Sequence, residues 1–539
     1  MNQQTTVDVA IAGYGPVGQT LAILLGQMGY SVAVFERWPA LYPLPRAVFY
    51  DHEIRRIFLS MGLGEELAKI SQPSARYQWF NADWKVLVEI DWSAESISDG
   101  PFGYLFNQPL LEAALDRKAK SIGNNVQIHQ GWEATALKQD ANGCDMVLNR
   151  VIREDGKFSL GDEQQSVRAR YVIGADGANS FVRQSLGIEW QDLGFQEDWL
   201  VVDLQPKPGV QLDVPDIGQW CNPERPTTMV PGGPGYRRWE FMRLPHETIE
   251  DLQDTDKVWS LLSRWVTPDT ADLVRHAVYQ FRSRIASNWH SGRVMLAGDA
   301  AHVMPPFMGQ GMCSGIRDAW NLSWRLDLLL RGLADETLLD SYTLERKPQI
   351  RAVIEASMAM GKVVCVSDPV KAAERDAAYL SGNVPPLPPF PGLTDGLLQK
   401  DGQLRGILGV HGSIEIGGKV SRYDDVIGRS FHLLVRGDEN PLAVLDPEQL
   451  AFIGDYDVKV VRLAKTADSS KGIYRDVSGK YLQFMAEAGL KALIVRPDYY
   501  CYGGVAELSA LPKLLNSLRE QLQHSSQTHV VNGGKACHA

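Results

Sequence analysis

The first forty residues alternate between short apolar runs and an apolar pattern of helical spacing. Residues 7–12 form an apolar run that predicts a buried parallel strand, and residues 31–35 form a second one. Between them, apolar side chains recur every three or four positions, at Val17, Leu21, Leu24, Leu25 and Met28. This order of strand, helix and strand predicts a βαβ unit.

The turn between the first strand and the helix carries Gly13, Gly15 and Gly18, and Glu36 follows the second strand. In a dinucleotide-binding turn the first glycine permits the bend and the second lets the backbone approach a pyrophosphate. The third glycine allows close packing of helix and strand. The helix start offers free N–H groups to phosphate, and Glu36 is placed to accept hydrogen bonds from a ribose. The pattern predicts nucleotide binding; the alternative is a structural turn without a ligand.

Two later apolar strands also end in turns that contain glycine and aspartate. Residues 169–174 run into Asp176-Gly177 at a helix start, where Asp176 can cap the helix or bind a ligand. Residues 293–297 run into a second such turn, which precedes a long helix at about 312–331. This turn contains Gly298, Asp299, Pro305, Pro306, Gly309 and Gly311. Both stretches repeat the strand–turn–helix order of the first turn.

Alternation of apolar and polar residues predicts sheet structure at about 75–105 and again at 191–285. We interpret the second stretch as an antiparallel sheet that forms one wall of a pocket. It contains Arg237, Arg238 and Arg243, which could hold an anionic substrate; the alternative is a solvated strand face. Arg46 follows a proline-rich loop. It could contact a phosphate group through its planar set of donors, or it could be a solvated surface charge.

The C-terminal third begins with a proline-rich stretch at 384–392, which predicts a stiff linker. Strands and helices alternate over 393–523 and predict a small α/β domain. Residues 524–539 are polar and are expected to be disordered.

Composition narrows the function classes. The formal net charge of -11 argues against nucleic acid and against an acidic membrane surface as partners. The six cysteines show neither CxxC nor metal-ligand spacing, so we expect no redox dithiol and no metal site. No apolar run reaches the length that spans a membrane, and the first residues lack the basic and apolar regions of a signal peptide, so we expect none there. These features predict a cytoplasmic protein.

The three glycine-bearing turns in this order resemble those of the single-component (class A) flavoprotein aromatic hydroxylases. The most specific stretch is Gly298-Asp299-Ala300-Ala301-His302-x-x-Pro305-Pro306, followed by Gly309-x-Gly311. The segment after the linker is similar to the thioredoxin-like domain of the phenol hydroxylase branch, without its cysteines. The stretches at 45–48 and 106–109 are most similar to the 3-(3-hydroxyphenyl)propionate hydroxylases of that group.

The resemblance implies an α/β fold with three parts. A Rossmann-like FAD-binding domain would comprise residues 1–190 and 286–383, with sheet insertions at about 75–105. An interleaved antiparallel-sheet substrate domain would cover 191–285, and a thioredoxin-like C-terminal domain 393–523. The C-terminal domain is a candidate oligomerisation element, and the chain is a candidate homodimer.

The resemblance also implies cofactor contacts, with FAD as the bound cofactor and NADH or NADPH as the transient reductant. The residues expected at FAD are Gly13, Gly15, Pro16, Val17, Gly18, Glu36, Arg37, Arg46, Gln108, Asp176, Gly298, Asp299, Pro306, Gly309, Gly311, Met312 and Cys313.

The implied cycle passes a hydride to FAD and adds O₂ to give a C4a-hydroperoxide, whose distal oxygen attacks an activated phenol ring. The expected catalytic residues are Pro306 beside the flavin, with His52 and Tyr236 as candidates to activate the phenol; Tyr50 and Tyr104 are further options. The preferred reaction is ortho-hydroxylation of 3-(3-hydroxyphenyl)propionate or a related phenol to a catechol. The alternatives are a hydroxylase of resorcinol or of an aromatic polyketide, and a non-catalytic binding protein on the same fold.

Overall fold

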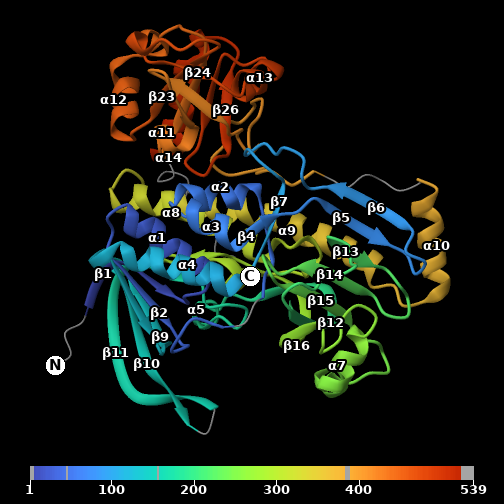
Figure 1. Ribbon diagram of the computed structural model, residues 1–539. Helices are drawn as coiled ribbons and strands as arrows, with labels where there is room; N and C mark the ends of the chain where they lie inside the picture. Colours follow the sequence, from blue (N-terminus) through green and yellow to red (C-terminus); the bar gives the residue numbers. More distant parts are fainter. Residues whose placement is uncertain (1–4, 44–45, 155–156, 383–388, 524–539) are drawn as a thin grey trace, which may run out of the picture. The chain divides into compact units, whose positions relative to one another are not determined.

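The structure, a computed structural model, describes residues 5–43, 46–154, 157–382 and 389–523 (Figure 1). The tail predicted to be disordered and most of the expected linker lie outside these residues. The described chain forms two compact units. One unit holds most of the chain before Phe390; the other holds residues 97–99, 320–349 and the chain from Pro391 onward. These units divide the chain at other places than the expected domain boundaries, which stay predictions.

A parallel sheet of the first unit contains the predicted βαβ strands. Its path runs through β18 (Val294–Leu296), β11 (Lys157–Gly174), β1 (Thr5–Ala12), β2 (Val32–Glu36) and β8 (Val126–Gln130). Antiparallel neighbours are β17 (His290–Ser291) on β18, and β9 (Trp132–Asp140) and β10 (Gly143–Glu154) beside β11. Ala12 pairs with both Phe35 and Gly174, and Gly174 pairs with Leu296. The three glycine-bearing turns therefore meet at the carboxyl edge of one sheet.

Local signals explain where the helices next to this sheet begin. Pro16 starts α1 (Pro16–Gln27), which packs against β1, β2 and α4 (Gln108–Ser121). The Asn107 side chain accepts the Leu110 N–H and caps α4. The other main helices before the C-terminal domain are α2 (His52–Ser60), α3 (Gly64–Ile70), α5 (Phe181–Ser185), α8 (Gln310–Leu330), α9 (Leu338–Val364) and α10 (Pro369–Leu380).

A second sheet of the first unit contains the predicted pocket wall. Its order is β19 (His302–Val303), β16 (Ala271–Ala286), β12 (Trp190–Pro206), β15 (Arg237–Met242), β14 (Thr227–Pro231), β13 (Ile217–Trp220), β5 (Arg76–Phe80) and β6 (Val86–Asp91). All pairs are antiparallel except β13 with β5. The strands at 76–91 therefore continue this sheet. A separate three-stranded sheet joins β3 (Phe49–Asp51), β7 (Gly103–Phe106) and β4 (Ser71–Pro73).

The two faces of the second sheet have opposite chemistry, because successive side chains of a strand point to opposite faces. Leu200, Val202, Trp239 and Phe241 lie on one face and form a buried core with α6 (Ile249–Gln253) and α7 (Thr255–Leu262). The alternate positions of β12 and β15, which include Asp203, Arg238 and Glu240, lie on the other face.

The second unit contains a seven-stranded sheet. Its order is β21 (Lys419–Arg422), β20 (Ser413–Ile416), β24 (Ile473–Asp476), β23 (Lys459–Ala464), β22 (His432–Arg436), β25 (Ala492–Val495) and β26 (Cys501–Val505). Strands β22 and β23 are parallel, and β25 and β26 continue the sheet as an antiparallel hairpin. This is the strand arrangement of a thioredoxin-like core. The helices are α11 (Tyr423–Ile427), α12 (Pro447–Asp455), α13 (Lys480–Glu487) and α14 (Leu511–Gln523).

Within the described ranges, no helix combines the length and the apolar character needed to cross a membrane.

Candidate active site

In the first glycine turn, Gly13 and Gly18 lie directly against other backbone atoms, whereas Gly15 has open space beside it. A Cβ atom on Gly13, whose φ is +100°, would come within 3.0 Å of the Ala175 carbonyl oxygen. A Cβ on Gly18 would come equally close to the Gly13 carbonyl oxygen. A Cβ on Gly15 would meet no atom within 4 Å, and Gly15 lines a cavity. The open side of this turn, at the start of α1, is where a phosphate group can approach.

Glu36 is held at the end of β2 beside this turn. Its Oε2 accepts the Tyr14 N–H at 2.8 Å, and its Oε1 accepts the Trp38 N–H at 2.9 Å. The neighbouring Arg37 is more than half exposed and lies 3.9 Å from Glu133. Neither Glu36 nor Arg37 lines the cavity, so their assignment to the cofactor stays a prediction.

Two aspartates at the same sheet edge retain hydrogen-bonding capacity. Asp176 Oδ2 accepts the Val182 N–H at 3.1 Å, while its Oδ1 is buried with no hydrogen-bond partner among the described residues. The Asp299 side chain is enclosed by protein but exposed to the cavity. Burial raises the pKa of both carboxyl groups. Such acceptors suit the hydroxyl groups of a sugar or ribityl chain.

The third turn leads into the start of α8 at the cavity. Pro306 begins a short 3₁₀ turn, and Gly309 has a φ of +65° and lies against Phe49. A Cβ on Gly311 would have no neighbour nearer than 4.0 Å, so the first turn of α8 is open to the cavity. For Cys313 the expected cofactor contact stays a prediction. Its thiol is buried and donates to the Phe49 carbonyl oxygen at 3.7 Å, and the residue does not line the cavity.

Gln108 holds the loop that carries Arg46. Gln108 Oε1 accepts the N–H groups of Arg46 at 3.1 Å and Ala47 at 2.5 Å. Gln108 Nε2 donates to Glu112 Oε1 at 2.6 Å, and burial raises the pKa of Glu112 to about 7. The sequence interpretation missed Glu112. The sequence did carry a signal for this contact, because Glu112 follows Gln108 by four residues at the start of a capped helix, and side chains at that spacing lie side by side.

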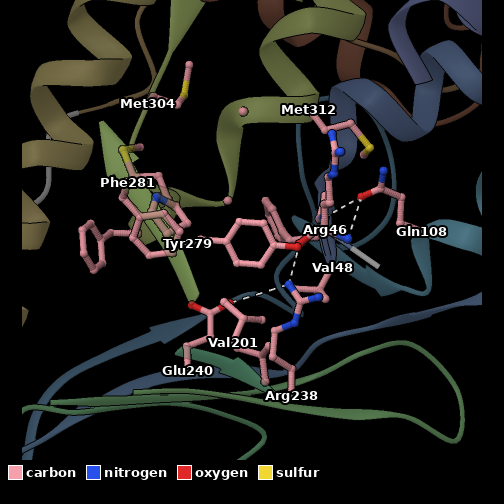
Figure 2. A pocket seen from close by; sticks show the side chains of 18 of the residues that line it. Arg46, Val48, Gln108, Val201, Arg238, Glu240, Tyr279, Phe281, Met304 and Met312 are labelled. Atoms are coloured by element: carbon pink, nitrogen blue, oxygen red, sulfur yellow. Dashed lines mark hydrogen bonds and ion pairs between the residues drawn. The ribbon is translucent and has the colours of Figure 1, made fainter. Parts of the chain in front are cut away.

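A cavity of about 400 Å³ joins the three glycine turns to the second sheet. Figure 2 shows Arg238 and Glu240 on one side of it and Met304 and Met312 on the opposite side, with Tyr279 pointing into the space between. Of the residues expected at FAD, those that line the cavity are Gly15, Pro16, Val17, Arg46, Gln108, Asp299, Pro306, Gly309, Gly311 and Met312. Gly13, Gly18, Asp176 and Gly298 lie in the same turns without lining it.

The sheet wall of the cavity carries a buried charge network. Asp203 on β12 pairs in register with Arg238 on β15 and with Arg275 on β16. Arg238 Nε donates to Asp203 Oδ1 at 2.7 Å, and Arg275 Nε donates to Asp203 Oδ2 at 3.1 Å. Arg275 Nη1 also donates to the Tyr279 hydroxyl at 2.6 Å, and Glu240 lies 3.6 Å from Arg238 Nη1. This network of the sheet wall, whose members Arg238, Arg275 and Glu240 line the cavity, therefore combines two cations with two anions.

The three arginines expected to bind substrate do not come together. Arg238 lines the cavity. Arg237 instead donates to the Pro215 and Asp216 carbonyl oxygens at 2.8 and 3.2 Å. Arg243 donates to Asp198 Oδ2 at 3.0 Å. A substrate role for Arg237 and Arg243 stays a prediction without a contact to the cavity.

The expected phenol-activating residues also lie outside the cavity lining. His52 begins α2, its ring lies 5.3 Å from that of Phe102, and burial lowers its pKa. Tyr236 lies in the turn before β15, where its N–H donates to the Gly233 carbonyl oxygen. Asp203, Glu240, Arg275 and Tyr279 line or support the wall instead, and the sequence interpretation missed them. The alternation along β15, with Arg238 and Glu240 on one face, was the available signal.

Comparison with known proteins identifies the family. A family model described as "FAD binding domain" matches residues 6–357, and one described as "HcaD C-terminal domain" matches residues 410–521. The chain is 37% identical over 518 residues to a probable NADH-specific resorcinol 4-hydroxylase of Rhodococcus jostii (strain RHA1), with 94% of each chain covered. It is 31% identical over 537 residues to a 3-(3-hydroxy-phenyl)propionate/3-hydroxycinnamic acid hydroxylase of Escherichia coli (strain SMS-3-5 / SECEC), covering 95% of this chain and 94% of that one.

Solved structures show the same fold. The flavin-dependent monooxygenase PieE superposes with a TM-score of 0.75 at 21% identity, covering 96% of this chain and 99% of that one. Aklavinone-11 hydroxylase superposes with a TM-score of 0.74 at 24% identity, covering 97% and 100%. The turn at Gly15, the orphan oxygen of Asp176 and the open start of α8 fit a bound FAD. The sequence matches over nearly the whole chain show that it belongs to the FAD-dependent aromatic hydroxylases, the class A flavoprotein monooxygenases.

Proposed function

We propose that this monooxygenase uses NADH and O₂ to hydroxylate a small uncharged phenol of the resorcinol type. The observation that supports this substrate is the charge balance of the cavity wall. Arg238 and Arg275 are both hydrogen-bonded to Asp203, and Glu240 faces Arg238. A carboxylated substrate would need an uncompensated cation, because burying an unpaired charge is costly. Arg46, the third arginine at the cavity, is the one that the resemblance assigns to FAD.

The relatives support the same choice. The relative named as a resorcinol hydroxylase is 37% identical to this chain, against 31% for the relative named as a hydroxyphenylpropionate hydroxylase. The first is named NADH-specific, which favours NADH as the reductant here. The carboxylated phenol is the second candidate, because Arg238 does line the cavity.

The chain's own residues would bind and shield the reacting groups. The Gly15 turn and the start of α1 would receive the pyrophosphate of FAD, and Asp176 and Asp299 its hydroxyl groups. The start of α8 at Gly311 would place positive potential beside the ring system. Bound FAD, once reduced, supplies the activation of O₂ for transfer of one oxygen atom to the phenol ring. Val201, Phe281 and other apolar lining residues exclude water from that space.

A matched pair of substrates tests the charge argument. The FAD-loaded protein would be assayed for NADH consumption and for hydroxylated product with resorcinol, 3-(3-hydroxyphenyl)propionate and its uncharged alcohol, 3-(3-hydroxyphenyl)propanol. We expect kcat/KM to be higher for resorcinol and for the alcohol than for the propionate. A tenfold preference for the propionate over the alcohol would overturn the proposal and favour the second candidate.

We further propose a cytoplasmic location, where NADH is available. The five cysteines of the described residues form no disulfide with one another, in keeping with a reducing compartment. A homodimer, and the absence of nucleic-acid, membrane and metal partners, stay predictions.

A further inference from the structure

We propose that Glu240 accepts the proton of the substrate's phenolic hydroxyl group and so activates the ring for hydroxylation. The inference rests on the proposed phenol substrate. It assigns this task to the sheet wall of the cavity, and to neither His52 nor Tyr236.

The fold presents Glu240 to the cavity. Glu240 pairs in register with Val201 on β12 and with Thr228 on β14, and all three residues line the cavity. The preceding and following residues, Trp239 and Phe241, belong to the core on the other face of the sheet. The Glu240 side chain is 12% exposed, and Figure 2 shows it at the cavity surface. Its carboxylate is therefore enclosed by protein but accessible to a molecule in the cavity.

The carboxylate retains its capacity to accept hydrogen bonds. Its ion-pair partner among the described residues is Arg238 Nη1 at 3.6 Å, which is beyond hydrogen-bond distance. Arg238 directs Nε and Nη2 to Asp203, and its Nη1 donates to the Arg46 carbonyl oxygen. No side chain of the described protein thus occupies the Glu240 oxygens, which are left for a hydroxyl group of the substrate.

The environment of Glu240 makes its carboxylate a stronger base than that of an exposed glutamate. The ionisable groups that face it are Arg238 on its own strand, Asp203 on β12, Arg275 and Tyr279 on β16, and Tyr77 on β5. Burial raises the pKa of Glu240, and the positive charge of Arg238 opposes this effect. A carboxylate with a raised pKa is closer in basicity to a phenol than an ordinary glutamate is.

The proton transfer is balanced without any further reactant. The O–H bond of the phenol breaks, and a new O–H bond forms on a Glu240 carboxylate oxygen. The electron pair stays on the substrate oxygen and delocalises to the ortho and para carbons, which become more nucleophilic. After oxygen transfer, the proton returns to an oxygen of the product or passes to solvent.

The test compares Glu240→Gln with the wild type and with Glu197→Gln, which changes a partly buried carboxylate of β12 outside the cavity lining. Each FAD-loaded protein would be assayed with resorcinol and with a polyfluorinated phenol that is already ionised at the assay pH. We expect Glu240→Gln to lower the rate of product formation from resorcinol by about 100-fold or more. The loss with the ionised phenol should stay within about tenfold. Glu197→Gln should resemble the wild type with both substrates.

Equal losses on both phenols, or no loss on either, would overturn the assignment of Glu240 while the proposed function stands. If the wild type hydroxylates no phenol, the proposed function itself fails. If Glu240→Gln does not fold, the pH profile of the wild type tests the assignment of Glu240. Its kcat/KM for resorcinol should fall as Glu240 is protonated at low pH, and no such fall should occur with the fluorinated phenol as long as the pH stays above that phenol's own pKa. Parallel profiles for the two phenols would refute the proposal.

Discussion

At the scale of single residues, Asp299 is a carboxylate with free acceptor capacity at the cavity. We expect Asp299→Ala to weaken FAD binding by about tenfold or more, because a hydrogen bond to a charged group contributes about 1.5–3 kcal/mol. Titration of the apoprotein with FAD, followed by flavin fluorescence, would measure this. Asp272→Ala, an exposed position on β16, is the control. An unchanged dissociation constant would remove Asp299 from the cofactor site.

Glu112 makes a second residue-scale prediction, for pH dependence. Its pKa is raised from 4.5 to about 7 by burial, so the folded state favours the protonated carboxyl. The associated stability is present below pH 4.5 and is lost as pH rises toward 7. The loss corresponds to about 3 kcal/mol, from 1.4 kcal/mol per pH unit. We expect Glu112→Gln, which cannot ionise, to gain stability relative to wild type between pH 5 and pH 8.

Urea unfolding of both proteins at the two pH values would measure this difference. A constant gap between variant and wild type would show that Glu112 does not titrate in this range. Because Glu112 holds Gln108, and Gln108 holds the backbone of Arg46, FAD affinity measured on the same samples would show whether the effect reaches the cofactor loop.

At the scale of elements, different glycines of the first turn are needed for folding and for FAD binding. Gly18→Ala would place a methyl group against the Gly13 carbonyl oxygen, so we expect the apoprotein to lose thermal stability. Gly15→Ala would meet no protein atom within 4 Å, so the apoprotein should melt as wild type does. Its methyl group would, however, stand where the pyrophosphate approaches, and FAD affinity should fall at least tenfold. Equal FAD affinity of Gly15→Ala and wild type would place the phosphate elsewhere.

Strand β15 shows how one element serves two purposes. Trp239 and Phe241 fill the core below the sheet, and Arg238 and Glu240 face the cavity above it. The strand was predicted from its alternation, and so was its place in a pocket wall. The alternation does not say which of the two faces borders the cavity, since arginines flank the strand on both faces. Only the packing of α6 and α7 against one face decides this.

At the scale of the whole molecule, a buried network of charged side chains connects helices α8 and α9 with the C-terminal domain inside the second unit. Glu345 on α9 bonds Arg496 through both carboxylate oxygens, at 2.6 and 2.9 Å, and lies 2.6 Å from Arg325 on α8. These three side chains are fully buried, and the two arginines lower the pKa of Glu345 to about 2. The network joins residues 320–349 to the C-terminal domain, where the expected boundary at 383 would separate them.

We expect Glu345→Gln to destabilise this unit by about 3–5 kcal/mol, because it leaves Arg325 buried without its anion and removes one of the two anions of Arg496, which keeps its ion pair with Asp498 at 2.6 Å. Differential scanning calorimetry would show a lower midpoint for the corresponding transition. Glu355→Gln, at an exposed position of the same helix, should change stability by no more than about 0.5 kcal/mol. In the wild type the stabilisation by Glu345 is present above its ordinary pKa of 4.5 and is lost as pH falls toward 2. Matching midpoints for Glu345→Gln and wild type would show that the network contributes nothing.

The local part of this protein could be predicted from its sequence. Apolar periodicity indicated the βαβ unit, the glycine spacing indicated a nucleotide turn, and the order of three turns indicated the flavoprotein hydroxylase family. These signals lie within single segments, where backbone geometry and side-chain spacing are set by neighbouring residues.

The wall of the cavity was decided only by the tertiary structure. Asp203 meets Arg238 and Arg275 across 35 and 72 residues of chain, and strand 76–80 joins strand 217–220. Such partners depend on which strands pair, and these strands are distant in sequence, so they come together only in the tertiary fold. The sequence by itself therefore determined where the cofactor turn lies and which family the chain resembles. The pairing of strands determined which carboxylate of the sheet wall, Glu240, faces the cavity.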